Sequence, residues 1–465
     1  MSAPLPTLRA AFSLAWPASL AAIVTPLLGL VDAGVLARAA GPADIAGVAL
    51  AGAVFSLIYW PLGGLRMSAA GLSAQAHGAG DEAGLRAHLV KAGVICGGIG
   101  VLLLLLKWPI AALAAVAMTS GTAASANATA AMRAYTDIRL WGVPAVAMLA
   151  GGLGWLTGQG RLKLVMAVLV GVTLLNAGLD VWFVMGLGYG VRGIAYGTLA
   201  AEVAGCGAMI GAVAWVLIQR GGLFVSWDRA RFAEDARRVV SMNADMLIRT
   251  AILSLVFAWF VRAGGRFGDV TLAANQVLMN LVLLTTLVID GAAIAAQTMV
   301  GQALGAKDAR AARFAGAVRE TSKLSAMLAV SLFLAMLVFG VPLLRAVVPP
   351  TEEAGAVFAV GREYLGWVTA APLVLAASFQ LDGIFIGATR GRALRNGMIV
   401  AGAVFVAGVF ALPPVMANHG LWLAFALFMA ARAVTLLLAW GGFARLVAGD
   451  EDAAPQRLHA EASGA

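Results

Sequence analysis

The chain has 465 residues, of which 61% are hydrophobic and only 12% are charged. An average soluble domain is about half apolar and about one quarter charged, so this composition excludes an ordinary soluble protein. The formal net charge of +9 does not indicate nucleic-acid binding, because the basic residues lie in short loops between apolar stretches. We therefore expect the chain to lie in the lipid bilayer and to bind no nucleic acid.

Apolar stretches long enough to cross a bilayer recur from end to end, and no alternating barrel pattern accompanies them. In hydrocarbon only helices then satisfy their own backbone hydrogen bonds. Breaks at glycine, proline and charge clusters define twelve spans, at residues 11–37, 45–76, 88–117, 136–158, 162–186, 190–219, 237–263, 270–304, 315–346, 362–389, 394–417 and 420–447. The sequence thus predicts an all-α integral membrane protein with twelve transmembrane helices.

The loop charges predict the orientation of these helices. Most of the loop lysines and arginines fall on one side of the predicted membrane, including those of the central loop between spans six and seven. Because basic loops stay in the cytoplasm, both termini and this central loop are predicted to be cytoplasmic. The polar residues 448–465 are predicted to form a disordered cytoplasmic tail.

An internal repeat divides the chain into two related halves. The end of span two reads GLSAQAHGAGD at residues 71–81, and the end of span eight reads TMVGQALGAKD at residues 298–308. A second match pairs LTGQGRLK at 156–163 with ATRGRALR at 388–395. We therefore predict two pseudo-symmetric six-helix lobes, at residues 1–220 and 237–447, joined by a cytoplasmic linker at 221–236. Two such bundles are the arrangement that secondary transporters use for alternating access.

Polar residues inside the first-half spans are the first candidates for function. An acidic residue near the centre of a membrane helix costs on the order of 3 kcal/mol, so it usually faces a cavity or a partner. Asp32 lies in span one, Asn176 and Asp180 lie four residues apart in span five, and Thr198 and Glu202 lie four apart in span six. Residues four apart share one helix face. Such a cluster could hold a proton, or supply oxygen ligands for sodium.

The second half does not repeat this cluster, so the coupling site is expected in the first half. The second half has its own intramembrane acids and amides, which could line a substrate cavity or serve as structural contacts between helices. The candidates for a substrate cavity are Asp290, Asp382, Gln276 and Asn280, together with Glu202 of the first half.

Several segments together resemble the multidrug and toxic compound extrusion (MATE) family of the MOP superfamily, in the branch named for the DNA-damage-inducible protein F (DinF). The resemblance covers nearly the whole membrane region. It rests on the order and spacing of LVDAGVLARAAGP, LRMSAAGLSAQAHGAGD, LLNAGLDVWFVMGLGYGVRGIAYGTLAAE, NADMLIRT and IAAQTMVGQALGAKD.

The resemblance implies twelve helices in two lobes, located in the inner membrane of a bacterium, and export of small amphipathic, often cationic, compounds in exchange for protons or sodium. It further implies a first-lobe cation site at the matching positions. These are Asp32, Asn176, Asp180 and Thr198, with Tyr135 as the candidate for a tyrosine that lines this site in some members. The same four oxygen-bearing residues would hold Na⁺ if sodium is the coupling ion.

Other functions remain open as alternatives. One is a lipid-precursor flippase of the same superfamily, for which Arg66, Arg249 and Arg432 are the arginines deep enough to act in a cavity. A membrane-embedded enzyme or scaffold is another, but the four histidines are scattered and no metal-binding motif occurs. We expect a monomeric, non-enzymatic antiporter of multidrug efflux type, with no cofactor besides its coupling ion and small organic compounds as substrates.

Overall fold

The computed structural model describes residues 5–39, 41–119, 126–223, 229–348 and 354–452. It does not describe the side chains of a few further stretches within helices, chiefly residues 24–33, 36–39, 114–119, 229–238 and 442–452.

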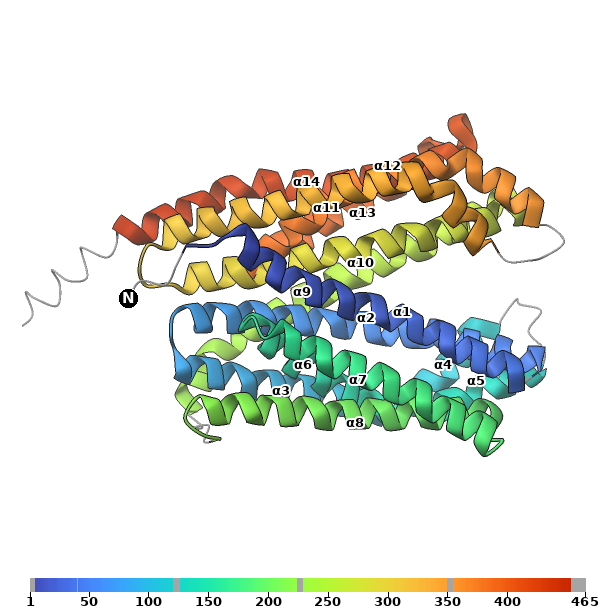
Figure 1. Ribbon diagram of the computed structural model, residues 1–465, viewed down its shortest axis with the longest axis horizontal. Helices are drawn as coiled ribbons and strands as arrows, with labels where there is room; N and C mark the ends of the chain where they lie inside the picture. Colours follow the sequence, from blue (N-terminus) through green and yellow to red (C-terminus); the bar gives the residue numbers. More distant parts are fainter. Residues whose placement is uncertain (1–4, 40, 120–125, 224–228, 349–353, 453–465) are drawn as a thin grey trace, which may run out of the picture. The chain divides into compact units, whose positions relative to one another are not determined.

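The described chain is helical throughout. The helices are α1 (Leu8–Ala39), α2 (Pro42–Gly78), α3 (Glu82–Leu105), α4 (Lys107–Thr119), α5 (Ala126–Arg139), η1 (Leu140–Gly142), α6 (Val143–Gly158), α7 (Leu162–Val181), η2 (Trp182–Gly186), α8 (Gly190–Gln219), α9 (Arg229–Gly264), η3 (Gly265–Phe267), α10 (Asp269–Gly305), α11 (Arg310–Val347), α12 (Ala354–Gly387), α13 (Gly391–Ala411) and α14 (Pro413–Asp452). Figure 1 labels the α-helices along the chain.

Eleven of the described helical segments are long and apolar enough to cross a membrane. The first predicted span, residues 11–37, lies in α1, which contributes the shorter apolar segment Leu8–Ile23 among the described residues. The third predicted span is divided between α3 and α4, the fourth is made of α5, η1 and α6, and the eleventh is divided between α13 and α14. The all-helical, multi-pass class is therefore confirmed, with short breaks inside three of the predicted spans.

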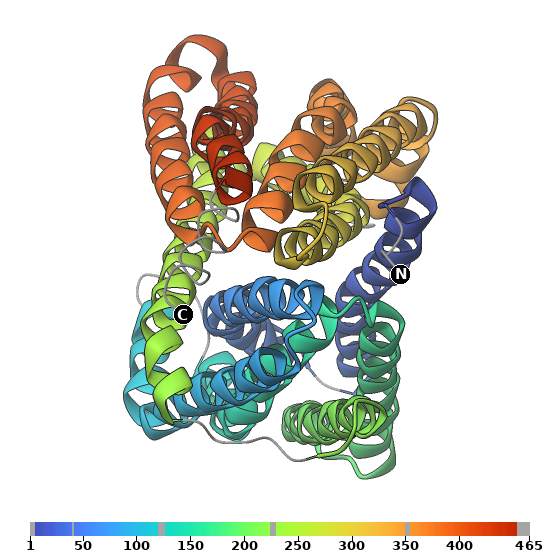
Figure 2. The same ribbon diagram turned by 90° about the vertical axis from the view of Figure 1, so that its left-hand side faces the viewer.

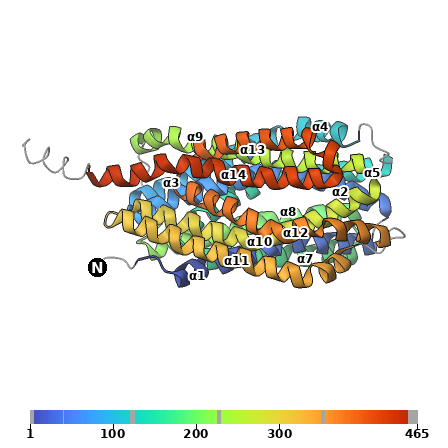
Figure 3. The ribbon, with the colours of Figure 1, turned by 90° about the horizontal axis from the view of Figure 1, so that it is seen from above.

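The chain packs into two compact units. The C-terminal unit contains Ala251–Ala465 together with Met1–Trp16 and Ala74–Gly80, and the N-terminal unit contains Pro17–Ser73 and Asp81–Thr250. Within each unit the helices form a bundle, which Figure 2 shows nearly end-on. Figure 3 shows that α10, α11, α12 and α14 of the C-terminal unit extend in nearly the same direction.

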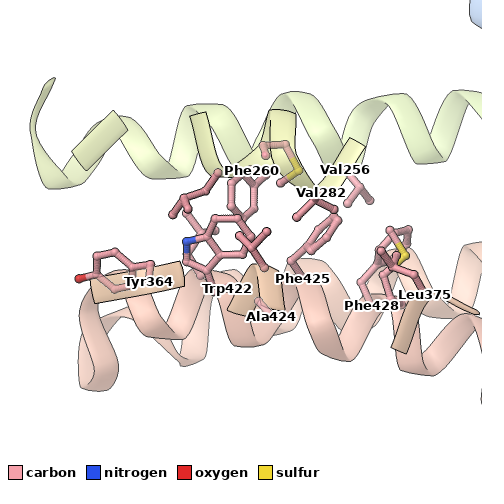
Figure 4. Packing of buried hydrophobic residues seen from close by; sticks show 14 of the residues in the cluster. Val256, Phe260, Val282, Tyr364, Leu375, Trp422, Ala424, Phe425 and Phe428 are labelled. Carbon is pink, nitrogen blue, oxygen red and sulfur yellow. The ribbon is translucent and has the colours of Figure 1, made fainter. Parts of the chain in front are cut away.

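Aromatic residues build the core of the C-terminal unit. The ring of Phe260 on α9 lies 5.1 Å from the ring of Trp422 and 5.6 Å from that of Phe425, measured between centroids. Figure 4 shows the ring of Phe260 on α9 facing Trp422 and Phe425 of α14, with Phe428 further along α14. Edge-to-face pairs of this kind add about 0.5–1.5 kcal/mol beyond the burial of their area.

Small residues let neighbouring helices approach closely in both units. A Cβ atom on Gly383 or Gly387 of α12 would overlap the backbone of α10, at Ala293 and Gln297 respectively. In the N-terminal unit, a Cβ on Gly154 of α6 would overlap the backbone of Arg66 on α2. Close backbone approach through small residues is typical of packing between membrane helices.

The predicted repeat has a structural counterpart. A Cβ on Gly78 would overlap the backbone of Gln302, and a Cβ on Gly305 would overlap the backbone of Gln75, which are the repeat-related residues. Gln75 Nε2 also donates a hydrogen bond to the carbonyl oxygen of Gly387 at 3.0 Å. The two segments of the first sequence match thus form a reciprocal helix contact at the ends of α2 and α10.

The second sequence match is out of register with the structure. Arg161 N donates to Leu156 O before α7, and Arg390 N donates to Phe385 O before α13. These equivalent turns are 229 residues apart, as the numbering of their hydrogen bonds shows. The alignment of 156–163 with 388–395 implies an offset of 232 residues, so this alignment is shifted by three residues. The shift arises because Gly and Arg each occur more than once in these two segments.

Candidate functional site

Three of the predicted coupling residues lie together between α7 and α8. Asn176 Nδ2 donates hydrogen bonds to Asp180 Oδ2 at 3.0 Å and to Thr198 Oγ1 at 3.4 Å. All three residues are buried, and Asp180 has an exposed fraction of 0%. Asn176 and Asp180 share one face of α7, one turn apart, as their spacing predicts.

A glycine allows α8 to approach this cluster. A Cβ on Gly197 would overlap Asp180 Oδ1, so only glycine fits beside the carboxylate. Thr198 Oγ1 donates to the carbonyl oxygen of Ile194 at 2.9 Å, which leaves its lone pairs directed at other donors. The close approach at Gly197 therefore places the hydroxyl oxygen of Thr198 on α8 next to the polar side chains of α7.

Oxygen atoms dominate the cluster. Asn176 Oδ1 accepts no hydrogen bond from the part of the chain that the structure describes. An ionised carboxylate and a hydroxyl oxygen are acceptors as well, whereas Asn176 Nδ2 is the donor that joins them. A group of buried acceptors suits a bound proton or a hard cation such as Na⁺.

The other two predicted members are placed less completely. Asp32 lies in α1, and its side chain is outside the described residues. Tyr135 is 3% exposed on α5, and its hydroxyl accepts a hydrogen bond from Arg139 Nη1 at 3.0 Å.

Glu202, one turn beyond Thr198 on α8, forms a largely buried ion pair that sequence reasoning missed. Arg139 Nη2 donates to Glu202 Oε1 at 3.1 Å, and the Tyr59 hydroxyl donates to the same oxygen at 3.0 Å. Arg139 follows Tyr135 by four residues, and this spacing places both on one face of α5.

Asp382 of α12 also has a buried partner. Its carboxylate accepts a hydrogen bond from Arg432 Nη2 of α14, and the side chains are 8% and 2% exposed. The sequence identifies Arg432 as deep in the membrane but does not pair it. The guanidinium group also lies over the rings of Phe379 and Phe428, at 5.5 and 5.7 Å from their centroids.

The remaining candidates of the substrate cavity lie apart from this pair. Gln276 and Asn280 are exposed on α10, one turn apart, and Asp290 of the same helix is partly exposed. The neighbouring Asn275 is buried instead, in a reciprocal amide pair with Asn418 at 2.8 and 2.9 Å. Within the described ranges, no three or more His, Cys, Asp or Glu residues are grouped to hold a metal ion.

Comparisons with known proteins agree on one family. The profile of the family described as MatE matches residues 17–182 and 246–413. The chain is 34% identical over 436 residues to the DNA damage-inducible protein F of Escherichia coli (strain K12), covering 93% of this chain and 92% of that protein. It is 26% identical over 331 residues to the multidrug resistance protein PmpM of Pseudomonas aeruginosa, covering 67% and 65% respectively.

Solved structures share the fold. A MOP superfamily transporter from Pyrococcus furiosus superposes with a TM-score of 0.82 at 19% identity, over 95% of this chain and 97% of that one. An outward-facing multidrug resistance MATE family transporter gives a TM-score of 0.80 at 19% identity, with the same coverage. Because the family profile covers most of the chain and the E. coli relative nearly all of it, this multi-pass membrane protein belongs to the MATE family of transporters and is not an enzyme.

Proposed function

We propose that the protein exports small amphipathic organic compounds, many of them cationic, in exchange for protons by alternating access. The observation that carries this proposal is Asp180, a fully buried carboxylate inside a membrane-spanning helix of a transporter-family member. A charge in that position is costly, so its presence favours a role in an ion pathway. Asn176 and Thr198 supply the polar contacts that such a site needs.

In this mechanism the coupling site is Asp32, Asn176, Asp180 and Thr198, with Tyr135 at its edge. A proton can drive the conformational cycle only by binding the two states of the transporter with different affinities. Protonation from outside would neutralise the cluster and favour release of the substrate outward, and deprotonation toward the cytoplasm would reset it. Sodium is the rival coupling ion, because the same oxygen atoms suit either cation.

The wider setting completes the proposal. The lobes at residues 1–220 and 237–447 would together provide alternating access to a substrate path, in a monomer with both termini in the cytoplasm of a bacterium. Two kinds of relative support the substrate class, since PmpM is named a multidrug resistance protein and one structural neighbour is a multidrug resistance transporter. Gln276, Asn280 and Asp290 are kept as candidates for lining this path.

A flippase has less support than efflux. That role calls for several basic side chains in the cavity, yet the buried Arg432 is bound to Asp382. An ion-paired arginine is a poor receptor for a lipid phosphate.

The test is export of a fluorescent cationic dye from proteoliposomes under an imposed proton or sodium gradient. We expect proton-driven export by the wild type and its loss in Asp180→Asn, while Asp137→Asn, an exposed acid on α5, retains it. Export by Asp180→Asn at the wild-type rate would refute the coupling role. Dependence on sodium alone would move the coupling ion to Na⁺ and keep the site.

A further inference from the structure

Three aromatic rings of the N-terminal unit surround a guanidinium group. The Arg139 guanidinium carbon lies 4.5 Å from the ring centroid of Phe55, 5.2 Å from that of Tyr59 and 5.6 Å from that of Tyr135. The Glu202 carboxylate supplies the opposite charge. We call Phe55, Tyr59, Tyr135 and Glu202 the cation box; they come from α2, α5 and α8. Arg139 occupies the box and is tethered to it as the last residue of α5.

The box has the chemistry that recognises planar organic cations. Aromatic faces attract a cation within about 6 Å of the centroid, most strongly where water is excluded. A guanidinium group adds donors in a fixed plane, which Tyr135 and Glu202 accept at 3.0 and 3.1 Å. This combination selects a guanidinium or amidinium group over a spherical cation, because both the plane and the donors are matched.

The tethered occupant fits the box incompletely. Arg139 and Glu202 meet through a single donor and a single oxygen, whereas arginine and a carboxylate often form two parallel hydrogen bonds. Arg139 Nε and Glu202 Oε2 are buried, and neither has a hydrogen-bond partner in the described parts of the chain. A buried charged group with an unused hydrogen-bonding atom loses stabilisation, so this box can hold a better-matched ligand.

Arg139 also stands at a break in the helix. It is the last residue of α5, and the three-residue 3₁₀ segment η1 separates it from α6, which carries Pro144 in its first turn. Short 3₁₀ segments inside a longer helix often mark hinges. Because the regular helix ends directly after Arg139, a change of its side-chain torsions would move the long arginine side chain out of the box and leave the four surrounding residues in place.

We propose that the cation box is a binding site for the guanidinium or amidinium group of an exported compound, which replaces Arg139 during transport. The inference rests on the proposed export function and specifies its substrate class. The box also shares Tyr135 with the coupling site, and Glu202 lies one turn from Thr198 on α8. Exchange of the occupant would therefore reach the coupling cluster through Tyr135, which belongs to both sites, and through α8.

The first experiment measures binding to the purified, full-length protein without any gradient. In Arg139→Ala, ethylguanidinium replaces the atoms that the substitution removes. We expect it to bind at least about tenfold more tightly than to the wild type, an effect that Glu202→Gln in the same chain cancels. Ethylammonium lacks the planar donors and ethylurea lacks the charge, so neither should show the gain. Arg133→Ala, an exposed arginine on the same helix, is the matched control.

Equal binding of ethylguanidinium to Arg139→Ala and wild type would overturn the proposal. If Arg139→Ala does not fold, Arg139→Gln supplies the same comparison, and ethylguanidinium should raise its melting temperature whereas ethylurea should not. If ethylguanidinium does not raise it, the proposal is likewise overturned.

The second experiment tests the exchange in the working transporter. Phenylguanidinium and trimethylphenylammonium share a ring and a charge and differ in the cationic group. We expect Glu202→Gln to raise the KM for phenylguanidinium at least about tenfold more than that for trimethylphenylammonium. Equal changes for the two compounds would refute the box as a substrate site while leaving export established. Absence of gradient-driven transport of either compound by the wild type would instead refute the proposed function, whereas the binding result would stand by itself.

Discussion

The ion pair between Asp382 and Arg432 permits a quantitative test of what the second-half aspartate does. Both side chains are nearly inaccessible, at 8% and 2% exposure, and they join α12 to α14. Arg432→Met keeps most of the side-chain volume and removes the charge. It leaves the carboxylate buried without its cation, and breaking a buried pair in this way costs about 3–5 kcal/mol. We therefore expect a large loss of stability from this single substitution.

Removing both charges should restore most of that loss. A hydrophobic pair of similar volume often equals or exceeds the stability of a buried ion pair, so Arg432→Met with Asp382→Leu is expected within about 1–2 kcal/mol of the wild type. The assay is a double-mutant cycle from reversible unfolding in detergent, which isolates the energy between the two residues. Arg362→Met, an exposed arginine on α12, serves as the control and should change stability by less than about 0.5 kcal/mol.

Additive losses in the double variant would refute the reasoning, because two residues that stabilise each other cannot be removed independently. The same variants also distinguish the two possible roles of Asp382, which are binding of substrate or ion and structural contact between helices. A residue that binds substrate or ion should lose transport on substitution to Asn with little change in stability. A structural residue should lose both in proportion.

Two further substitutions test contacts within the C-terminal unit. Asn275→Leu breaks the reciprocal bonds to Asn418 and the bond from Trp422 Nε1 at 2.9 Å, and should lower the unfolding free energy by about 2–3 kcal/mol; an unchanged melting temperature would contradict this. Gly305→Ala places a Cβ against the backbone of Gln75 and should cost about 1–3 kcal/mol, whereas the neighbouring Ala306→Ser should cost less; equal melting temperatures for the two variants would argue against close packing there.

The sequence predicts best those contacts that lie within one helix or follow from its period. Asn176 and Asp180 are four residues apart, and a helix places such residues on one face, so their hydrogen bond could be expected. The repeat likewise identifies Gly78 and Gly305 as equivalent positions, but it does not predict that their helix ends contact each other. Only the contact within one helix is determined by the local pattern alone.

Contacts between distant helices are not determined locally. Arg139 and Glu202 are 63 residues apart, and Asp382 and Arg432 are 50 apart, so no spacing in the sequence relates the partners. The helical register between α5 and α8, or between α12 and α14, depends on how the glycines and side chains of both helices pack. The three-residue error in the second repeat match has the same origin, because the turn is defined by its backbone hydrogen bonds rather than by its Gly and Arg residues.

The two ion pairs join corresponding helices of the two halves at positions that the repeat does not relate. In the first half the arginine lies on the fourth predicted span and the acid on the sixth; in the second half the acid lies on the tenth and the arginine on the twelfth. Arg139 and Asp382 are 243 residues apart, whereas the repeat offset is 227 to 229 residues, so these two charges do not occupy matching positions. Since the attraction between two charges is the same whichever helix carries which sign, either arrangement can hold the two helices together. Alignment of the halves therefore does not predict these pairs, and only the three-dimensional arrangement shows that each half contains one.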